Sequence, residues 1–425
     1  MPSWCFLVSL SFMGSGLEGM IMFSVILGLD WMGGSFVTMS IFVGVLSVLC
    51  MEELVSGDST SWGFVVVLFS VVMFSVLSFL SVNFLVFLFC FESSLIPMSV
   101  MILCWGYQPE RVQALLQLVL YAFLGGIPTL VSVVSVCGLE SSVNMEVLHV
   151  VSASRFNGGA VSWFLLMAGM LVKVPLFFFH GWLTKAHVEA PSSGSMILSG
   201  VLLKVGVFGI WRVMYSMKGV PCGLVQVLVV VSLWGGLVCS LVCLSCYDVK
   251  LVVAYSSVSH MAMVLAGLLM SSSIAWYGSL CISVIHGFCS ACMFMMAGVL
   301  YSVCGSRSSY LCKGISKLSM MIYGTWFLLC SVNMSAPPFA AFFGECFLVA
   351  GIFGLGSALI GVVLLLCIIM SGVYNTVLFG SVCHGSGSSL ITACEMWSVR
   401  GVASCWSGMI MILVFSTNLF ILLGY

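Results

Sequence analysis

Charged residues are scarce in this 425-residue chain, and their scarcity excludes most classes of soluble protein. Only 6% of the residues are Asp, Glu, Lys or Arg, whereas 62% are hydrophobic, and the mean hydropathy is +1.27. The formal net charge of −1 argues against nucleic acid or an anionic lipid surface as a main partner. No long charged run or low-complexity linker marks a soluble domain. We therefore predict a single membrane domain, residues 1–425, surrounded by membrane lipids.

Cofactor-binding motifs are also missing from the sequence. It contains no GxGxxG or Walker-type loop, no haem or iron–sulfur spacing and no hydrolytic triad. Two C-x-x-C pairs, Cys243/Cys246 and Cys289/Cys292, could form a zinc or redox site, and His286 is close to the second pair. Small apolar side chains packed between helices are the favoured interpretation, because thiolates would have to be desolvated in lipid. We expect no metal and no redox cofactor in this chain.

Long apolar stretches are what the sequence has in abundance. About 20 apolar residues cross a bilayer as a helix. The predicted fold is therefore an all-α polytopic membrane protein with about 13 transmembrane helices. The predicted spans are residues 4–28, 33–50, 62–81, 83–105, 112–137, 160–181, 190–216, 222–245, 248–270, 273–302, 317–354, 357–380 and 407–424.

Prolines predict a break in two of these spans. Pro175 follows Lys173 closely in span 160–181, and Ala336–Pro338 interrupts span 317–354. Proline removes a backbone hydrogen bond, which lipid tolerates only where protein or water satisfies the freed group. The breaks are five spans apart, which favours two inverted-topology five-helix repeats, each with a broken helix, although simple kinks explain them equally well. The proposed divisions are 62–216 for the first repeat, 222–380 for the second, and 1–61 and 381–425 for flanking helices.

Basic residues in the loops predict the orientation of the chain. By the positive-inside rule, the loops after even-numbered spans face the inner compartment, together with the N-terminus, and the C-terminus faces outward. These loops contain Arg111, Lys185, Lys250, Arg307, Lys313 and Arg400, with Lys317 at an edge. The opposite loops contain only Arg155 and Lys218, with Arg212 near a span end.

Ionisable residues inside the predicted spans are the best candidates for function. A charge at the centre of a bilayer costs roughly 2.5–3.5 kcal/mol, so several of them indicate a path for protons or ions. The candidates are Glu92, Lys173, Lys204, His260, His286 and Glu345.

Each of Glu92, Lys173 and Lys204 can be interpreted as a proton-transfer group or as a purely structural residue. Glu92 and Lys173 could form a proton switch that titrates as a pair, or a static buried ion pair. Lys204 lies near the middle of span 190–216, which favours a relay station over a side chain that reaches the interface. Glycines 200, 206 and 209 would let a neighbouring helix approach it closely.

The two histidines and the remaining candidates are read in the same way. Ser256 and His260 share a helix face, as a proton wire would require, but a lone buried imidazole is often only a hydrogen-bonding partner between helices. Glu345 follows the second proline break, where it could be a terminal proton carrier or a carboxyl satisfied by loosened backbone. The predicted inner loops 105–111 and 183–191 are unusually polar. In the second loop, His187 and Glu189 could be proton entry groups or ordinary interfacial caps.

Segments around these residues resemble the subunit 4 family of mitochondrial NADH:ubiquinone oxidoreductase (respiratory complex I), an antiporter-like family. The resemblance covers about residues 30–380. The sequence departs from the family pattern at two points. It has Thr184 where a proline is usual, and it has thirteen predicted spans where fourteen are usual. The segments that carry it are Phe91–Pro97, Trp105–Arg111, Val172–Leu176, Lys185–Pro191, Leu202–Gly206, Ala254–Met261, His286–Gly287 and Gly344–Glu345.

The resemblance implies a proton-translocating membrane-arm subunit of an NADH:ubiquinone reductase in the mitochondrial inner membrane. The N-terminus would face the matrix and the C-terminus the intermembrane space. NADH, FMN, iron–sulfur clusters and ubiquinone are expected elsewhere in the complex, and the antiporter-like subunits 2 and 5 as neighbours. In the implied relay, Glu92 pairs with Lys173, the axis continues through Lys204, His260 and His286, and Glu345 is the distal acid. The alternatives are a cation/proton antiporter subunit outside the respiratory chain and a structural membrane scaffold.

Overall fold

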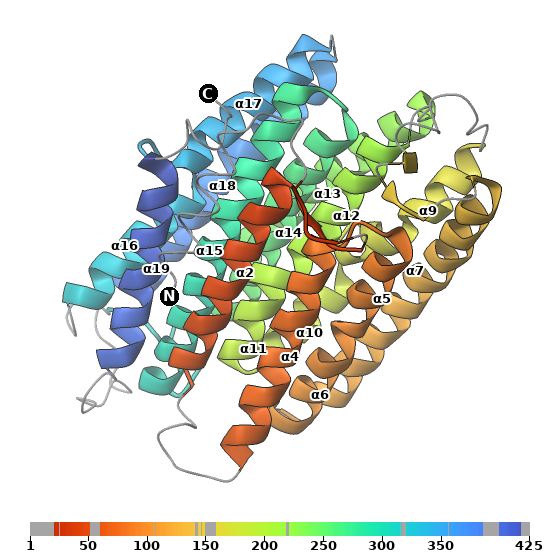
Figure 1. The fold of residues 1–425 in the computed structure, drawn as a ribbon. Helices are drawn as coiled ribbons and strands as arrows, with labels where there is room; N and C mark the ends of the chain where they lie inside the picture. The colour runs from red at the N-terminus through yellow and green to blue at the C-terminus, as the bar shows by residue number, and fades with distance from the viewer. Residues whose placement is uncertain are drawn as a thin grey trace.

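Backbone hydrogen bonding explains why the apolar stretches form helices. In lipid, each N–H and C=O must be satisfied within the protein, and an α-helix does this within one segment. The computed structural model (Figure 1) describes residues 21–417 except 25, 52–59, 107, 141–142, 146, 149–158, 218–220, 315, 317–319, 356 and 386–398. Two short strands, β1 (Ile21–Met22) and β2 (Gly28–Leu29), pair antiparallel where the described chain begins.

Helical segments then follow one another with few residues between them, which confirms the all-helical membrane class. The first half contains α2 (Trp31–Leu49), α4 (Thr60–Leu80), α5 (Phe84–Ser93), α6 (Leu95–Trp105), α7 (Arg111–Glu140), α9 (Ala160–Lys173), α10 (Gly181–Glu189), α11 (Ser192–Ile197), the π-helical turn η1 (Leu198–Leu202) and α12 (Leu203–Ser216). The second half contains α13 (Cys222–Ser245), α14 (Val249–Leu269), α15 (Ser273–Cys304), α16 (Met320–Asn333), α17 (Ala340–Gly354), α18 (Ala358–Cys383) and α19 (Val399–Thr417).

Nine helical stretches in the described residues are long and apolar enough to cross a membrane. The predicted spans 160–181 and 317–354 each divide into shorter helices. The predicted first span, 4–28, lies mostly outside the described residues, and its described end forms strands instead of helix. A turn forms there because the Ser24 hydroxyl accepts the backbone N–H of Leu27 at 3.0 Å. The number thirteen therefore stays a prediction.

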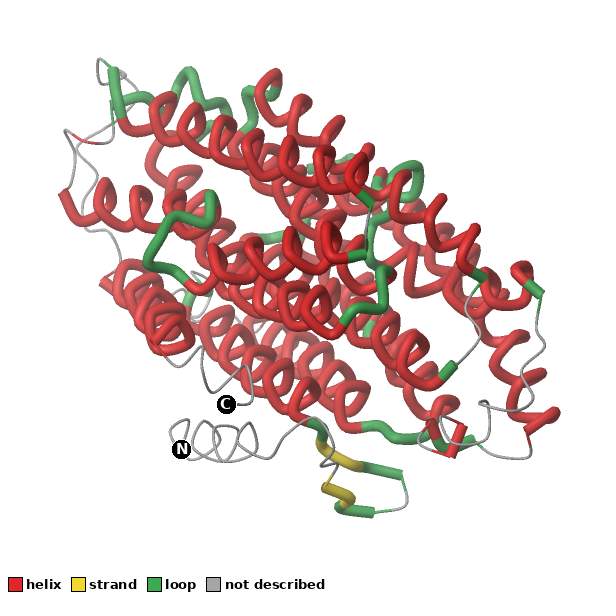
Figure 2. The backbone as a smooth tube through the Cα atoms, turned by 90° about the horizontal axis from the view of Figure 1, so that it is seen from above, coloured by secondary structure: helices red, strands yellow, loops and turns green. Residues whose placement is uncertain are grey.

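Burial separates central helices from peripheral ones. The most apolar stretch of α15 is 100% buried and that of α14 is 89% buried, whereas that of α7 is only 28% buried. Figure 1 shows α14 and α15 running through the middle of the bundle and α7 along one side. Figure 2, viewed from above, shows the helices in closely packed rows with the two strands at one edge. A polar group on α14 or α15 is thus shielded from lipid.

Both predicted helix breaks are present. Helix α9 ends at Lys173 and α10 begins at Gly181, with Pro175 in between. Helix α16 ends at Asn333 and α17 begins at Ala340, with two prolines in the gap. Each break leaves backbone carbonyl groups without their intrahelical donors in the interior of the bundle.

The polar segment 183–191, predicted to be a loop, is mostly helical and buried. Its residues up to Glu189 belong to α10, where Leu183 and Ala186 are 0% exposed. The indole Nε1 of Trp182 donates to the Val172 carbonyl at 3.1 Å and ties α10 back to the end of α9. Because apolar side chains anchor this helix in the core, the polar residues between them are carried inward.

Close approach of α12 to the first break follows the glycine pattern in the sequence. A Cβ on Gly206 would lie 2.7 Å from Cγ2 of Val174, and a Cβ on Gly209 would lie 2.9 Å from Cγ of Met170. Any larger residue would clash, so these two glycines allow α12 to contact the end of α9.

Candidate functional site

Lys173 occupies the end of α9 at the first break and is 4% exposed. Its ammonium donates to the backbone carbonyl of Phe91 and lies 3.2 Å from the centroid of the Phe91 ring. A cation is favoured at a helix C-terminus and over the face of an aromatic ring. The broken helix thus holds a buried ammonium without a carboxylate in direct contact.

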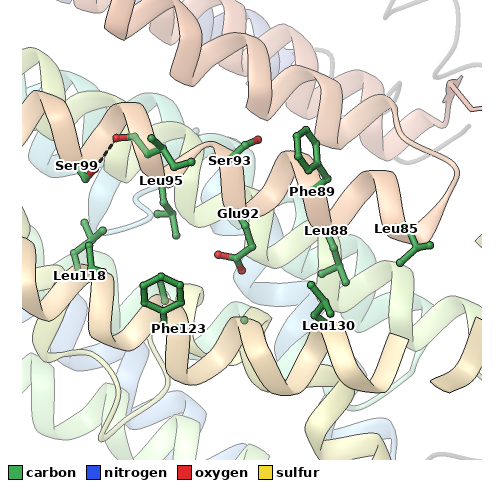
Figure 3. Close-up of a pocket in the computed structure, with 14 residues that line it drawn as sticks. Leu85, Leu88, Phe89, Glu92, Ser93, Leu95, Ser99, Leu118, Phe123 and Leu130 are labelled. Carbon is green, nitrogen blue, oxygen red and sulfur yellow. Dashed lines mark hydrogen bonds between the residues drawn. The ribbon is translucent and has the colours of Figure 1, made fainter. Parts of the chain in front are cut away.

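Glu92 follows Phe91 in the chain but points in another direction. Figure 3 shows its carboxylate directed into a lateral pocket of about 450 Å³ between α5–α6 and α7. The wall is mostly apolar and includes Leu88, Phe89, Leu118, Phe123 and Leu130. A Cβ added to Gly126 of α7 would lie 3.0 Å from Oε1 of Glu92, so this glycine makes room for the carboxylate.

Glu92 and Lys173 are neighbours that do not touch. They are close enough to attract each other electrostatically. The described part of the chain nevertheless contains no ion pair between them. In this arrangement, here called open, each residue has separate contacts, and their pairing stays a prediction.

Lys204 lies at the centre of the bundle and is 0% exposed. Its ammonium donates to the Ser199 carbonyl at 2.6 Å and lies 3.1 Å from Nδ1 of His286. The π-helical turn η1 contains Ser199, and π-helical turns often occur at functional sites because they shift the backbone hydrogen bonding. Lys204 therefore has no access to the membrane interface, and its partners are inside the protein.

The two buried histidines are adjacent in space. The rings of His286 on α15 and His260 on α14 have centroids 5.3 Å apart. Nε2 of His286 has no hydrogen-bond partner within the described ranges. Since His286 also contacts Lys204, three predicted site residues from three helices form one group.

Tyr374, which sequence reasoning missed, continues this group on the side away from Lys204. Its hydroxyl lies 3.2 Å from Nε2 of His260 and 3.3 Å from the Ser259 hydroxyl. The Ser256 hydroxyl donates to the Val253 carbonyl of its own helix at 2.8 Å, and its part in a proton wire with His260 stays a prediction. The hydroxyl that contacts His260 directly comes from a different helix, α18.

A polar cluster surrounds the second helix break beside Tyr374. The next residue, Asn375, accepts from Nδ2 of Asn333 at 2.9 Å. Ser335 lies within the break and donates to Oε1 of Glu345 at 2.6 Å. Glu345 is 5% exposed, so this carboxyl group is buried and is satisfied by a hydroxyl of the break.

His187 is completely buried but makes few polar contacts. Its ring stacks on Phe294 with centroids 4.4 Å apart, and neither ring nitrogen has a hydrogen-bond partner among the described residues. Lys204 and Lys250 both lie close enough to repel a positive charge on it. His187 thus lies between the central lysine and a second polar cluster.

Glu189 belongs to that second cluster, at one end of the bundle. Its Oε1 lies 3.9 Å from a guanidinium nitrogen of Arg307, and Lys250 donates to the neighbouring Ala190 carbonyl at 3.4 Å. A cavity of about 180 Å³, here called the Lys185 pocket, reaches Glu189. It is lined by Glu110, Gln113, Ala114, Thr184, Lys185, Val188, Glu189 and Leu251. The two polar segments 105–111 and 183–191 therefore line one pocket, which agrees with the prediction that both lie on the same side of the membrane.

Sequence reasoning also missed a buried ion pair at the opposite end of α12. Arg212 is 1% exposed and pairs with Asp30, the residue that precedes α2. The signal for these missed residues was weak but present. Asp30 lay in a predicted loop, whereas Tyr374 and Asn375 are adjacent polar residues in an otherwise apolar helix.

The buried core brings together lysine, histidine and glutamate side chains, each of which can bind and release a proton. In the described residues, no group of three or more His, Cys, Asp or Glu side chains could hold a metal ion. A membrane bundle with two broken helices and ionisable residues in its core is typical of transporter-like membrane subunits.

Comparison with known proteins gives the family. The family model described as NADH:quinone oxidoreductase/Mrp antiporter, TM matches residues 81–371. NADH-ubiquinone oxidoreductase chain 4 of Locusta migratoria is 35% identical over 400 residues, which cover 94% of this chain and 89% of the relative. The same protein of Mytilus edulis is 35% identical over 362 residues, 84% of this chain and 81% of the relative. The chain therefore belongs to this antiporter-like family, and within it to the chain 4 subunits of NADH-ubiquinone oxidoreductase.

Solved structures agree on the fold. A chain of respiratory complex I from Thermus thermophilus with bound NADH superposes with a TM-score of 0.85 at 20% identity, covering 98% of this chain and 90% of that one. A chain of the Mrp complex from Dietzia sp. DQ12-45-1b gives a TM-score of 0.83 at 16% identity, covering 100% of this chain and 91% of that one. At these identities the likeness concerns the fold alone.

Proposed function

We propose that this chain is a proton-translocating membrane-arm subunit of respiratory complex I in the mitochondrial inner membrane. The observation that carries the proposal is the buried contact series from Lys204 through His286 and His260 to Tyr374. The complex I relatives support the assignment to that assembly. Electron transfer from NADH to ubiquinone would supply the energy. NADH, FMN, the iron–sulfur clusters and ubiquinone would be bound by other subunits.

In this proposal, Glu92 and Lys173 act as a switch next to the central lysine. In the open arrangement, the Lys173 charge is held at the Phe91 carbonyl. When Lys173 moves to Glu92, the two charges compensate each other, which would lower the electrostatic cost of protonating Lys204 on α12, the helix that contacts the end of α9. Lys204 then binds a proton more easily. Reopening the pair raises this cost again and favours transfer from Lys204 to His286.

The two ends of the relay have separate roles in the proposal. His187 and Glu189 would pass protons from the Lys185 pocket toward Lys204, since His187 lies near Lys204 and Glu189 lines the pocket. Glu345 would be the distal acid, with Ser335 orienting its carboxyl group. Water molecules would bridge the gaps between these groups.

The surroundings of the chain follow from the same proposal. The Lys185 pocket would open to the matrix, with the N-terminus on the matrix side and the C-terminus on the intermembrane-space side. Antiporter-like subunits 2 and 5 would be neighbours, and lipids would cover the remaining apolar faces. The ranges 62–216 and 222–380 would be inverted repeats of one membrane domain, each with one of the two breaks.

A cation/proton antiporter subunit outside the respiratory chain is the second candidate. The specific observation in its favour is the fold that this chain shares with the Mrp complex chain. Native electrophoresis of mildly solubilised membranes separates the candidates, with mass spectrometry to find this chain. Co-migration with a very large assembly that oxidises NADH supports the complex I subunit. Migration in a small complex without NADH oxidation contradicts it.

Lys204→Met tests the relay against a purely structural scaffold. Removing the central ammonium should lower the rate of coupled proton translocation by roughly tenfold or more in an assembled complex, because one proton-transfer station is lost. Lys313→Met removes the same charge from a loop, where Lys313 lies 4.5 Å from the Tyr310 ring centroid, and should leave translocation unchanged. Normal translocation by assembled Lys204→Met would contradict the relay.

A further inference from the structure

Tyr374 lines a cavity that the relay described above does not use. This cavity, here called the Tyr374 cavity, measures about 140 Å³. Its wall comes from the α13–α14 junction, from the loop after α15 and from α18. The residues that matter here are Cys246, Tyr247, Ser309, Tyr310, Tyr374 and Ser381.

The Tyr374 cavity leads from the surface of the bundle to its core. Tyr247 and Tyr310 are 57% and 55% exposed, whereas Tyr374 is 1% exposed. Ser381 lies two turns beyond Tyr374 on α18, which corresponds to about 10 Å along the helix axis. At its inner limit, Tyr374 contacts His260 through its hydroxyl at 3.2 Å. The cavity and the central histidine are thus separated by one phenol group.

The cavity is large and polar enough for water. A cavity needs a volume of roughly 10–15 Å³ to hold one water molecule, and it needs several polar groups that can hydrogen-bond to that molecule. A volume of about 140 Å³ exceeds that several-fold. Hydroxyl groups of Ser309, Ser381 and the tyrosines, with the Cys246 thiol, supply hydrogen-bonding partners along the wall. Cys246 of the C-x-x-C pair belongs to this wall.

The mouth of the cavity lies at the same end of the bundle as the Lys185 pocket. Backbone bonds join the α13–α14 junction to the loop after α15, from Val249 N to Arg307 O at 3.1 Å and from Ser309 N to Tyr247 O at 2.8 Å. Arg307 also pairs with Glu189, which lines the Lys185 pocket. The Lys185 pocket and the Tyr374 cavity therefore open at the same end of the protein. They are lined by different helices and lead toward the same buried group of Lys204, His286 and His260.

We propose that the Tyr374 cavity is a second water-filled proton entry and that Tyr374 passes protons from it to His260. This inference rests on the proposed relay function. As a hydronium ion in the cavity gives a proton to the phenol oxygen, the phenol O–H proton moves to the unprotonated Nε2 of His260. The oxygen of Tyr374 keeps one proton throughout, one water molecule is left, and His260 becomes the imidazolium. No oxidant or other reactant is needed.

Tyr374→Phe removes the hydroxyl while keeping the ring. In the assembled complex, we expect the rate of coupled proton translocation to fall several-fold and the solvent deuterium isotope effect on NADH oxidation to change. Tyr323→Phe is the matched control, because Tyr323 on α16 packs against Phe379 of the same helix α18. It should leave both quantities unchanged. A purely structural role for Tyr374 would lower the amount of assembled complex without altering either quantity.

Ser381→Phe tests the cavity without touching His260, so it also decides the matter should Tyr374→Phe fail to assemble. The added ring narrows the cavity, and translocation should again fall several-fold. Thr376→Phe adds the same ring at an exposed position of α18 outside the cavity wall and should have no effect. Normal translocation in assembled Ser381→Phe and Tyr374→Phe overturns the entry. Lys204→Met separates the failures: a loss there with normal translocation in Ser381→Phe retains the relay and removes only this entry.

Discussion

The polar contacts at the first helix break differ from those at the second. At the first helix break, Lys173 contacts a backbone carbonyl and an aromatic ring, and Glu92 faces the lateral pocket. At the second break, side chains bind one another: Ser335 donates to Glu345 at 2.6 Å, and Asn333 donates to Asn375 at 2.9 Å. We call the first break the open end and the second, which is closed by direct hydrogen bonds, the closed end.

This difference indicates where movement is needed. Groups that are already joined by hydrogen bonds need less rearrangement before a proton passes than groups that are apart. A lysine held on a carbonyl must move before it can pair with a carboxylate. Control is thus expected at Glu92 and Lys173, and conduction at the second break. Substitutions at the two ends should differ accordingly.

The largest effect is expected from Lys173→Met. It removes the ammonium of the open end and leaves Glu92 without its nearby cation, so the switch cannot close. The rate of coupled proton translocation should fall by roughly tenfold or more, as expected when a proton-transfer group is removed. The measurement is the rate of proton uptake, with the rate of NADH oxidation, in sealed vesicles that contain the assembled complex. An unchanged rate with full assembly would show that control lies elsewhere.

A smaller effect is expected from Glu345→Gln at the closed end. The amide oxygen of Gln can still accept a hydrogen bond from the Ser335 hydroxyl, as Oε1 of Glu345 does at 2.6 Å in the native protein. The group can no longer release a proton, and translocation should fall about fivefold while the complex assembles normally. Ser335→Ala, measured in the same assay, removes only the orienting hydroxyl and should cost less than Glu345→Gln. The reverse order would make Ser335, and not the carboxyl group, the important partner.

Sequence patterns predicted the helices and the burial of the candidate residues because hydropathy and scarce charges are local signals. Lys204 and His286 stand out in apolar stretches, and both are buried as expected. Their contact depends on how α12 packs against α15, which no local pattern specifies. Segment 183–191 was misassigned for a related reason: its polar residues alternate with buried Leu183 and Ala186, and only packing shows that α10 turns inward.

The Tyr374 contact illustrates the limit most clearly. A tyrosine in an apolar helix is usually an interfacial or packing residue, so its presence in the sequence says little about function. The contact forms because α18 packs beside α14 and brings the phenol within 3.2 Å of His260. Ser256 was the local choice on helix periodicity, yet its hydroxyl is satisfied by its own backbone. In lipid, local hydroxyl-to-carbonyl bonds compete with contacts between helices.

The smallest effect is expected from Gly126→Ala, which disturbs the open end without changing any charge. The new methyl group would lie 3.0 Å from Oε1 of Glu92, so the carboxylate must shift away from its position in the lateral pocket. Such crowding costs about 1 kcal/mol, and translocation should fall by roughly fivefold at most. Gly138→Ala on the same helix α7 meets no atom within 4 Å and serves as the matched control. If both variants behave alike in the vesicle assay, the position of Glu92 in the pocket has no part in control.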